Sequence, residues 1–71
     1  MNDWQQRVID EADALRVKCV ALDKFLDTEI FDTLPLEEQA KLAAQAWFMS
    51  MYLMVLTERI NSFDTTEEKT D

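Results

Sequence analysis

The sequence LAAQAWFMSMYLMVLTERINSF, residues 42–63, carries the clearest structural pattern of this chain. Apolar side chains recur along it at alternating steps of four and three residues. Because an α-helix turns once in about 3.6 residues, this spacing places them on one helical face. The face consists of Leu42, Ala46, Met49, Leu53, Leu56, Ile60 and Phe63. The stretch therefore predicts a long amphipathic helix.

A second helix is predicted between Trp4 and Leu26, where the same alternation of steps occurs. Its apolar face consists of Val8, Ala12, Leu15, Cys19, Leu22 and Leu26. Acidic residues crowd the end of this helix, where they oppose the helix dipole, and Pro35 suits the first turn of a new helix. We therefore expect a break near residues 28–35 and an antiparallel helical hairpin.

Composition favours an all-α fold, because the 71 residues include no glycine and one proline. The turns and bulges of β-sheets draw heavily on glycine. A chain this short forms one small domain. We assign residues 1–63 to a helical hairpin domain. Residues 64–71, DTTEEKTD, contain no apolar side chain and are expected to form an acidic disordered tail.

One partner helix cannot cover the apolar residues that lie off the face of residues 42–63. These residues are Trp47, Phe48, Met51, Met54 and Val55. Fully burying each of them contributes roughly 1.5–3 kcal/mol. The chain has one cysteine and no histidine. Neither an internal disulfide nor a common zinc site can therefore stabilise its small hydrophobic core. We therefore expect a helical homo-oligomer that packs through these residues.

A membrane span is the alternative interpretation of the same stretch. Only residues 42–57 separate Lys41 from Glu58, and Gln45 and Ser50 interrupt them. A bilayer requires about 20 apolar residues. The sequence therefore predicts no contact with a membrane interior.

The charge balance excludes a further class of partner. Fifteen acidic residues against seven basic ones give a net charge of −8, which repels a nucleic-acid backbone. We expect no DNA or RNA partner. The N-terminus lacks the basic and apolar regions of a signal peptide, so we expect a cytoplasmic protein in which Cys19 is a reduced core residue.

The sequence favours a binding protein over an enzyme. It offers no histidine to act as a general base or metal ligand, and no glycine for a phosphate-binding loop. We expect no catalytic residues, no metal site and no cofactor.

A candidate binding surface lies on the first predicted helix. Arg7 and Lys18 differ by about 20° around the helix axis, and Trp4 stands one turn before Arg7. An aromatic ring beside aligned cations can stack on a base and pair with its phosphate.

Each candidate also has a purely structural interpretation. Arg7 can pair with Asp3, Asp10 or Glu11, and Trp4 can close the end of the core. Arg59 can offset the dipole of the second helix as easily as it binds a ligand. Thr28 can bind a ligand, but a helix cap is its more common use.

The order of landmarks resembles the helical-hairpin family of phage anti-CBASS sponge proteins. The pattern is Phe-x-x-Leu before Glu-Gln, then Gln-x-x-x-Met-x-x-Tyr, then Arg-Ile, and it spans about residues 15–60. The residues that carry it are Phe25, Leu26, Thr28, Phe31, Leu34, Glu38, Gln39, Leu42, Gln45, Met49, Tyr52, Leu56, Arg59 and Ile60.

The resemblance implies a compact hexamer in the host bacterial cytoplasm. Such a protein sequesters cyclic di- and trinucleotides without cleaving them and so blocks activation of a CBASS effector. The family's pockets lie between protomers, which implies Trp4, Arg7, Lys18 and Arg59 as ligand contacts, with Lys24 and Thr28 as second choices. Two alternatives remain open: an acidic phage protein that inhibits a host protein by direct binding, and a structural adaptor.

Deleting residues 64–71 is expected to leave assembly intact, because the deleted segment has no apolar side chain to dock. Sedimentation and the melting temperature of the shortened chain test this expectation. A drop of several degrees would show that the segment packs on a neighbour.

Overall fold

The structure is a computed structural model, which describes the backbone of residues 2–70 and the side chains of residues 2–63. Over these residues the chain forms three helices and no strand: α1 (Asp3–Leu26), α2 (Glu29–Asp32) and α3 (Leu36–Thr70). The all-α prediction is confirmed. The predicted tail at residues 64–71 lies outside the residues whose side chains are described, and it stays a prediction.

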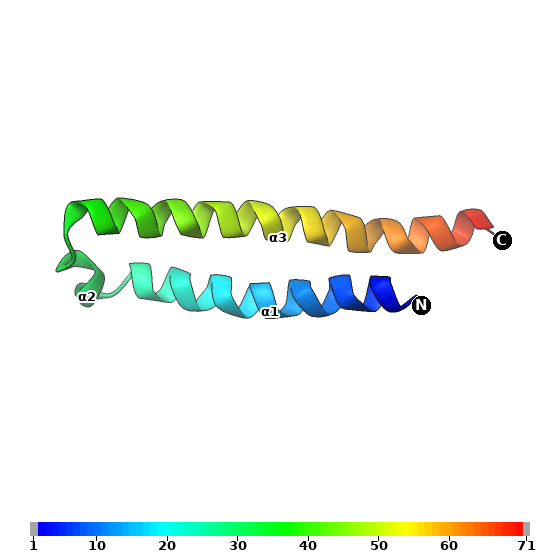
Figure 1. Cartoon of the computed structure of the whole chain (residues 1–71), viewed down its shortest axis with the longest axis horizontal. Coiled ribbons are helices and arrows are strands. Elements are labelled where there is room, and N and C mark those ends of the chain that lie inside the picture. Colours follow the sequence, from blue (N-terminus) through cyan, green and yellow to red (C-terminus); the bar gives the residue numbers. More distant parts are fainter. Residues whose placement is uncertain (1, 71) are drawn as a thin grey trace.

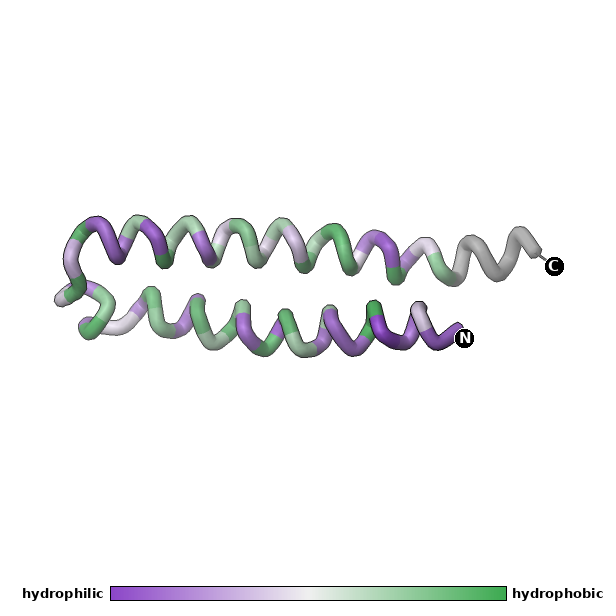
Figure 2. The backbone as a smooth tube through the Cα atoms, viewed as in Figure 1, coloured by the Kyte–Doolittle hydropathy of each residue, from purple (hydrophilic) through white to green (hydrophobic). Residues whose placement is uncertain are grey.

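The two long helices lie side by side and run in opposite directions, with α2 at the turn between them (Figure 1). The chain measures 56 × 16 × 14 Å along its principal axes, so it is a rod one helix pair wide. Hydrophobic and hydrophilic positions alternate along both helices (Figure 2). A pair of helices with this pattern buries one stripe of each and leaves the rest in solvent.

The core consists of the residues that the spacing predicted. Val8 and Ala12 of α1 are buried against Leu56 and Phe63 of α3. Leu15, Leu53 and Ile60 pack against this cluster from both helices. Cys19 is also buried, in agreement with its prediction as a core residue. The core is therefore a single thin seam.

The predicted break at residues 28–35 is present, but it contains the one-turn helix α2, which the sequence analysis did not foresee. The Thr28 hydroxyl accepts a hydrogen bond from the Phe31 amide at 3.3 Å and so caps the start of α2. The rings of Phe25 and Phe31 pack edge to face at 6.2 Å. These local contacts order the break that the acidic residues indicated.

The start of α3 is fixed by two residues. Pro35 immediately precedes the helix, and its carbonyl accepts the first helical hydrogen bond from the Gln39 amide at 3.0 Å. The Gln39 side chain donates back to the carbonyl oxygens of Leu34, at 2.8 Å, and Asp32, at 3.3 Å. Both ends of the link are thus tied to the helices they join.

Leu56→Ala is expected to lower the free energy of unfolding by about 2–5 kcal/mol, because Leu56 is 1% exposed and the seam has few neighbours to fill the cavity. Urea unfolding followed by circular dichroism measures the change. Asn61→Ala, at an exposed position of the same helix, is the control and should change stability by less than about 0.5 kcal/mol. Equal losses in both variants would contradict the assigned core.

Candidate functional site

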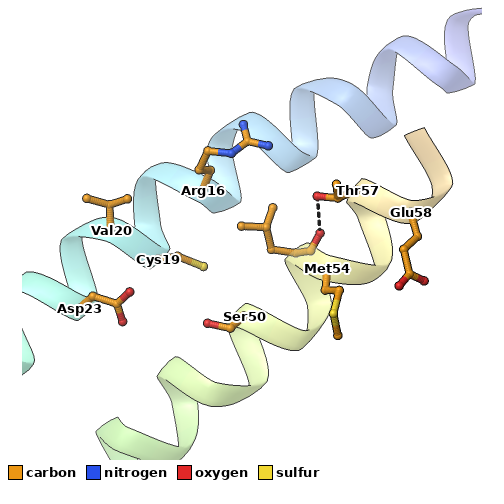
Figure 3. A pocket seen from close by; sticks show the side chains of 9 residues that line it. Arg16, Cys19, Val20, Asp23, Ser50, Met54, Thr57 and Glu58 are labelled. Atoms are coloured by element: carbon orange, nitrogen blue, oxygen red, sulfur yellow. Dashed lines mark hydrogen bonds between the residues drawn. The ribbon is translucent and has the colours of Figure 1, made fainter. Parts of the chain in front are cut away.

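An open groove of about 460 Å³ runs between α1 and α3 on one side of the pair (Figure 3). Its lining is mostly apolar and consists of Arg16, Cys19, Val20, Asp23, Ser50, Leu53, Met54, Thr57 and Glu58. The hydroxyl of Thr57 is already engaged, because it donates to the Leu53 carbonyl at 2.9 Å. The groove contains none of the residues predicted to bind a ligand.

The charges of the groove do not suit an anion. Asp23 and Glu58 contribute two carboxylates, against one guanidinium from Arg16. That guanidinium is paired with Asp13, with 2.9 Å between the nitrogen and the carboxylate oxygen. A phosphate would therefore meet a net negative charge in the groove.

Three of the predicted cations lie on the opposite side of the pair. At 100° per residue, Arg7 lies about 180° around α1 from the groove residue Arg16, and Lys18 about 160°. On α3, Arg59 lies about 160° from the groove residue Thr57. All three cations are exposed. We call this surface, defined by Arg7, Lys18 and Arg59, the basic flank.

The basic flank places its cations at two levels along the rod. Trp4 and Phe63 are in ring contact at 5.2 Å, and Arg7 and Arg59 each stand about one turn inward from that contact. They therefore share one level. Lys18 lies eleven residues beyond Arg7, or about 16 Å along the axis. Lys24 lies about 120° around α1 from Lys18, so one chain does not gather all four cations at one point.

Among residues 2–63, the four cations Arg7, Lys18, Lys24 and Arg59 have no acidic partner. In the described part of the chain, ion pairs join Arg16 to Asp13 and Lys41 to Glu37, the latter at 3.2 Å. Neither Arg7, Lys18, Lys24 nor Arg59 makes an ion pair among residues 2–63. The alternative interpretation, in which Arg7 is occupied by Asp3, Asp10 or Glu11, is therefore wrong for this structure.

The Sequestin family model matches residues 2–62. The chain belongs to the Sequestin family. It is also 40% identical over 63 residues to an uncharacterized 7.5 kDa protein from the denB–rIIB intergenic region of Enterobacteria phage T4. That match covers 89% of this chain and 98% of the phage protein. No solved structure matches the chain. The range matched to Sequestin contains every candidate residue discussed here.

Two half-exposed aromatic residues, Trp4 and Tyr52, accompany the cations of the basic flank. Trp4 closes the end of the seam against Phe63, as its structural interpretation predicted, yet half of its surface stays exposed. Tyr52 is half exposed as well and was not selected from the sequence. It lies two turns before Arg59 on the same face of α3, near the level of Lys18. The seven-residue spacing between Tyr52 and Arg59 is the sequence signal that places both on one face of a helix.

Thr28 acts as a helix cap. Its hydroxyl donates to the Phe25 carbonyl at 2.6 Å and accepts from the Phe31 amide. The capping interpretation is confirmed, and both hydrogen-bonding roles of the hydroxyl are already used.

A second exposed surface lies on α3, and we call it the apolar face. It consists of the predicted interface residues Trp47, Phe48, Met51, Met54 and Val55. Trp47 is 59% exposed and Phe48 is 64% exposed. Met51 is half-buried instead, which corrects the expectation that it has no cover within the chain. Its neighbours one turn away on the same helix include Trp47, Phe48 and Val55.

Metal-binding clusters and membrane-spanning helices are both absent from the described residues. No group of three or more Cys, Asp or Glu side chains is placed there to hold a metal ion. Within the same residues, no helix has the length and hydropathy needed to cross a bilayer.

Thr28→Ala is expected to lower the free energy of unfolding by about 1 kcal/mol, because the cap of α2 is lost. Thermal or urea unfolding measures this. Thr33→Ala is the matched control, since the Thr33 hydroxyl donates to the Ile30 carbonyl and caps no amide. A Thr28 variant of unchanged stability would contradict the capping role.

Proposed function

We propose that this protein is a phage sponge that binds cyclic di- and trinucleotides and holds them away from a bacterial CBASS effector in the host cytoplasm. The proposal rests on the presence of cations that have no acidic partner. In a chain of net charge −8, Arg7, Lys18 and Arg59 share one flank and make no ion pair in the described residues.

The family relationship supports capture as the activity. The name Sequestin describes sequestration, and the T4 relative is a phage protein. Both agree with the sponge family that the sequence resembles. They also support a bacteriophage origin for this chain.

The chemistry of the basic flank fits a nucleotide. A guanidinium can hold a phosphate with two parallel hydrogen bonds, and an exposed aromatic ring can stack on a base. Trp4 stands beside the level of Arg7 and Arg59, and Tyr52 near that of Lys18. Each level thus combines an aromatic ring with at least one cation. The ring can stack on a base of a cyclic nucleotide while the cation pairs with its phosphate.

A single chain offers only half of an enclosing pocket. The flank is an open helical surface, and about 16 Å separates Arg7 from Lys18 along α1. One chain can present Arg7 and Arg59 to a ligand together, but enclosing the ligand requires a second copy of the chain opposite the flank. We propose a homo-oligomer, expected to be a hexamer, in which pockets are completed between copies.

The proposed activity is binding without chemistry. The chain has no histidine to move a proton, and every Asp and Glu among residues 2–63 is exposed. The ligand is held by ion pairs and stacking and is released intact when the protein unfolds.

Arg7→Ala and Lys18→Ala are each expected to weaken the binding of cyclic di- or trinucleotides at least ten-fold, because a hydrogen bond to a charged group contributes about 1.5–3 kcal/mol. Isothermal titration calorimetry on the assembled protein measures the effect. Arg16→Ala is the matched control for Arg7→Ala: it removes the same charge from the same helix, on the groove side. Binding should weaken as salt rises.

Chromatography of the ligand after denaturation should return it unmodified. Sedimentation of each variant shows whether the oligomer survives, so that lost binding is not mistaken for lost assembly. If the wild-type protein gives no heat with any cyclic di- or trinucleotide at low salt, the sponge proposal fails and direct inhibition of a host protein takes its place.

A further inference from the structure

The apolar face of α3 has a symmetric order of residue sizes about its centre. Trp47 and Phe48 lie one turn before Met51, and Met54 and Val55 lie one turn after it. At 100° per residue, Trp47 and Met54 lie on one side of the face, and Phe48 and Val55 on the other. Each side thus carries one large ring three or four residues before Met51 and one smaller aliphatic group three or four residues after it.

From this order we infer that the apolar face binds the same face of a second copy in antiparallel orientation, with a two-fold axis passing beside Met51. The inference rests on the self-association included in the proposed function, and it specifies the partner, the orientation and the register. Under this symmetry Trp47 packs against the second copy's Met54, and Phe48 against the second copy's Val55. Met51 meets its own equivalent at the centre.

Packing explains why the antiparallel orientation is preferred. A parallel pair in register would place Trp47 against Phe48 at one level and Met54 against Val55 at another. The helices would then be held apart at the aromatic level and leave voids at the aliphatic one. The antiparallel pair combines a large and a small group at both levels, so the two helices keep a constant separation.

The charges that border the apolar face favour the same orientation. Lys41 precedes it and Glu58 follows it, and both are exposed. A parallel pair would bring each charge to the level of its own equivalent, which is repulsive. In the antiparallel pair, Glu58 reaches the level of the second copy's Ala44, about one turn from its Lys41. The small side chain of Ala44 leaves room for Glu58.

The exposed apolar area of this face is large enough to form the centre of an interface. The exposed parts of Trp47, Phe48, Met54 and Val55 amount to on the order of 400 Å² per copy, about half of what one partner buries in a standard interface. Met51, Ala44 and the stems of Lys41 and Glu58 extend the contact along the helix. A patch of this size is comparable to the largest apolar patch on a typical monomer, and such patches are often functional.

Disulfide crosslinking tests the orientation and register. All variants carry Cys19→Ala, because Cys19 and Glu58 line the same groove and could otherwise form an internal disulfide. Ala44→Cys and Glu58→Cys chains are mixed in denaturant, refolded together and oxidised. The mixture should give a covalent dimer of one chain of each kind, while neither chain alone should. Met51→Cys should crosslink to itself.

Three outcomes would overturn the inference. Efficient self-crosslinking of Ala44→Cys would show a parallel pair, since the antiparallel register separates the two Ala44 positions by about 21 Å. Failure of both expected crosslinks in variants that keep their helical signal would exclude this register. Sedimentation of the wild-type chain as a folded monomer would show that the face serves a different protein.

The experiment uses no nucleotide, so it separates this inference from the sponge proposal. Crosslinked dimers that bind no cyclic nucleotide would support the two-fold contact while the ligand proposal fails. Ligand binding without the predicted crosslinks would keep the sponge and reject the contact.

Discussion

Ala12 packs closely against the seam around Leu56, and this contact holds the two long helices together. Both side chains are fully buried, and the methyl group of Ala12 lets the two long helices approach closely. With only two helices, this contact covers one stripe of each. Every other apolar residue of α3 must stay in water or find cover on another molecule. The thin core and the exposed apolar face are therefore two results of the same geometry.

A second consequence concerns charge. Because the pair is a rod, it has two separate flanks, and the chain distributes its charges unequally between them. On the groove side, Arg16 is paired with Asp13 and faces further carboxylates. On the basic flank, Arg7, Lys18 and Arg59 keep their charge unpaired within the described residues. A strongly acidic protein can thus gather unpaired cations on one flank, which net charge alone does not indicate.

Much of this arrangement followed from the sequence, because helical spacing sets which residues share a face. The seam from Val8 to Phe63 was predicted in this way, as was a break that included Thr28. What spacing could not supply was the relation between the two helices. The groove, the common level of Arg7 and Arg59, and the place of Tyr52 beside Lys18 depend on how α1 and α3 are aligned. The choice of ion pairs depends on rotamers, so the freedom of Arg7 was not predictable either.

The contacts of the chain reversal are all made between residues close in sequence. Thr28 bonds within three residues on either side, Phe25 reaches Phe31, and Gln39 reaches back to Asp32 and Leu34. Closing such short loops has a small entropic cost, whereas bringing Trp4 to Phe63 requires ordering nearly the whole chain. The reversal therefore has the properties of a folding nucleus: it can form first and align the two helices, which then close progressively toward the N-terminus of α1.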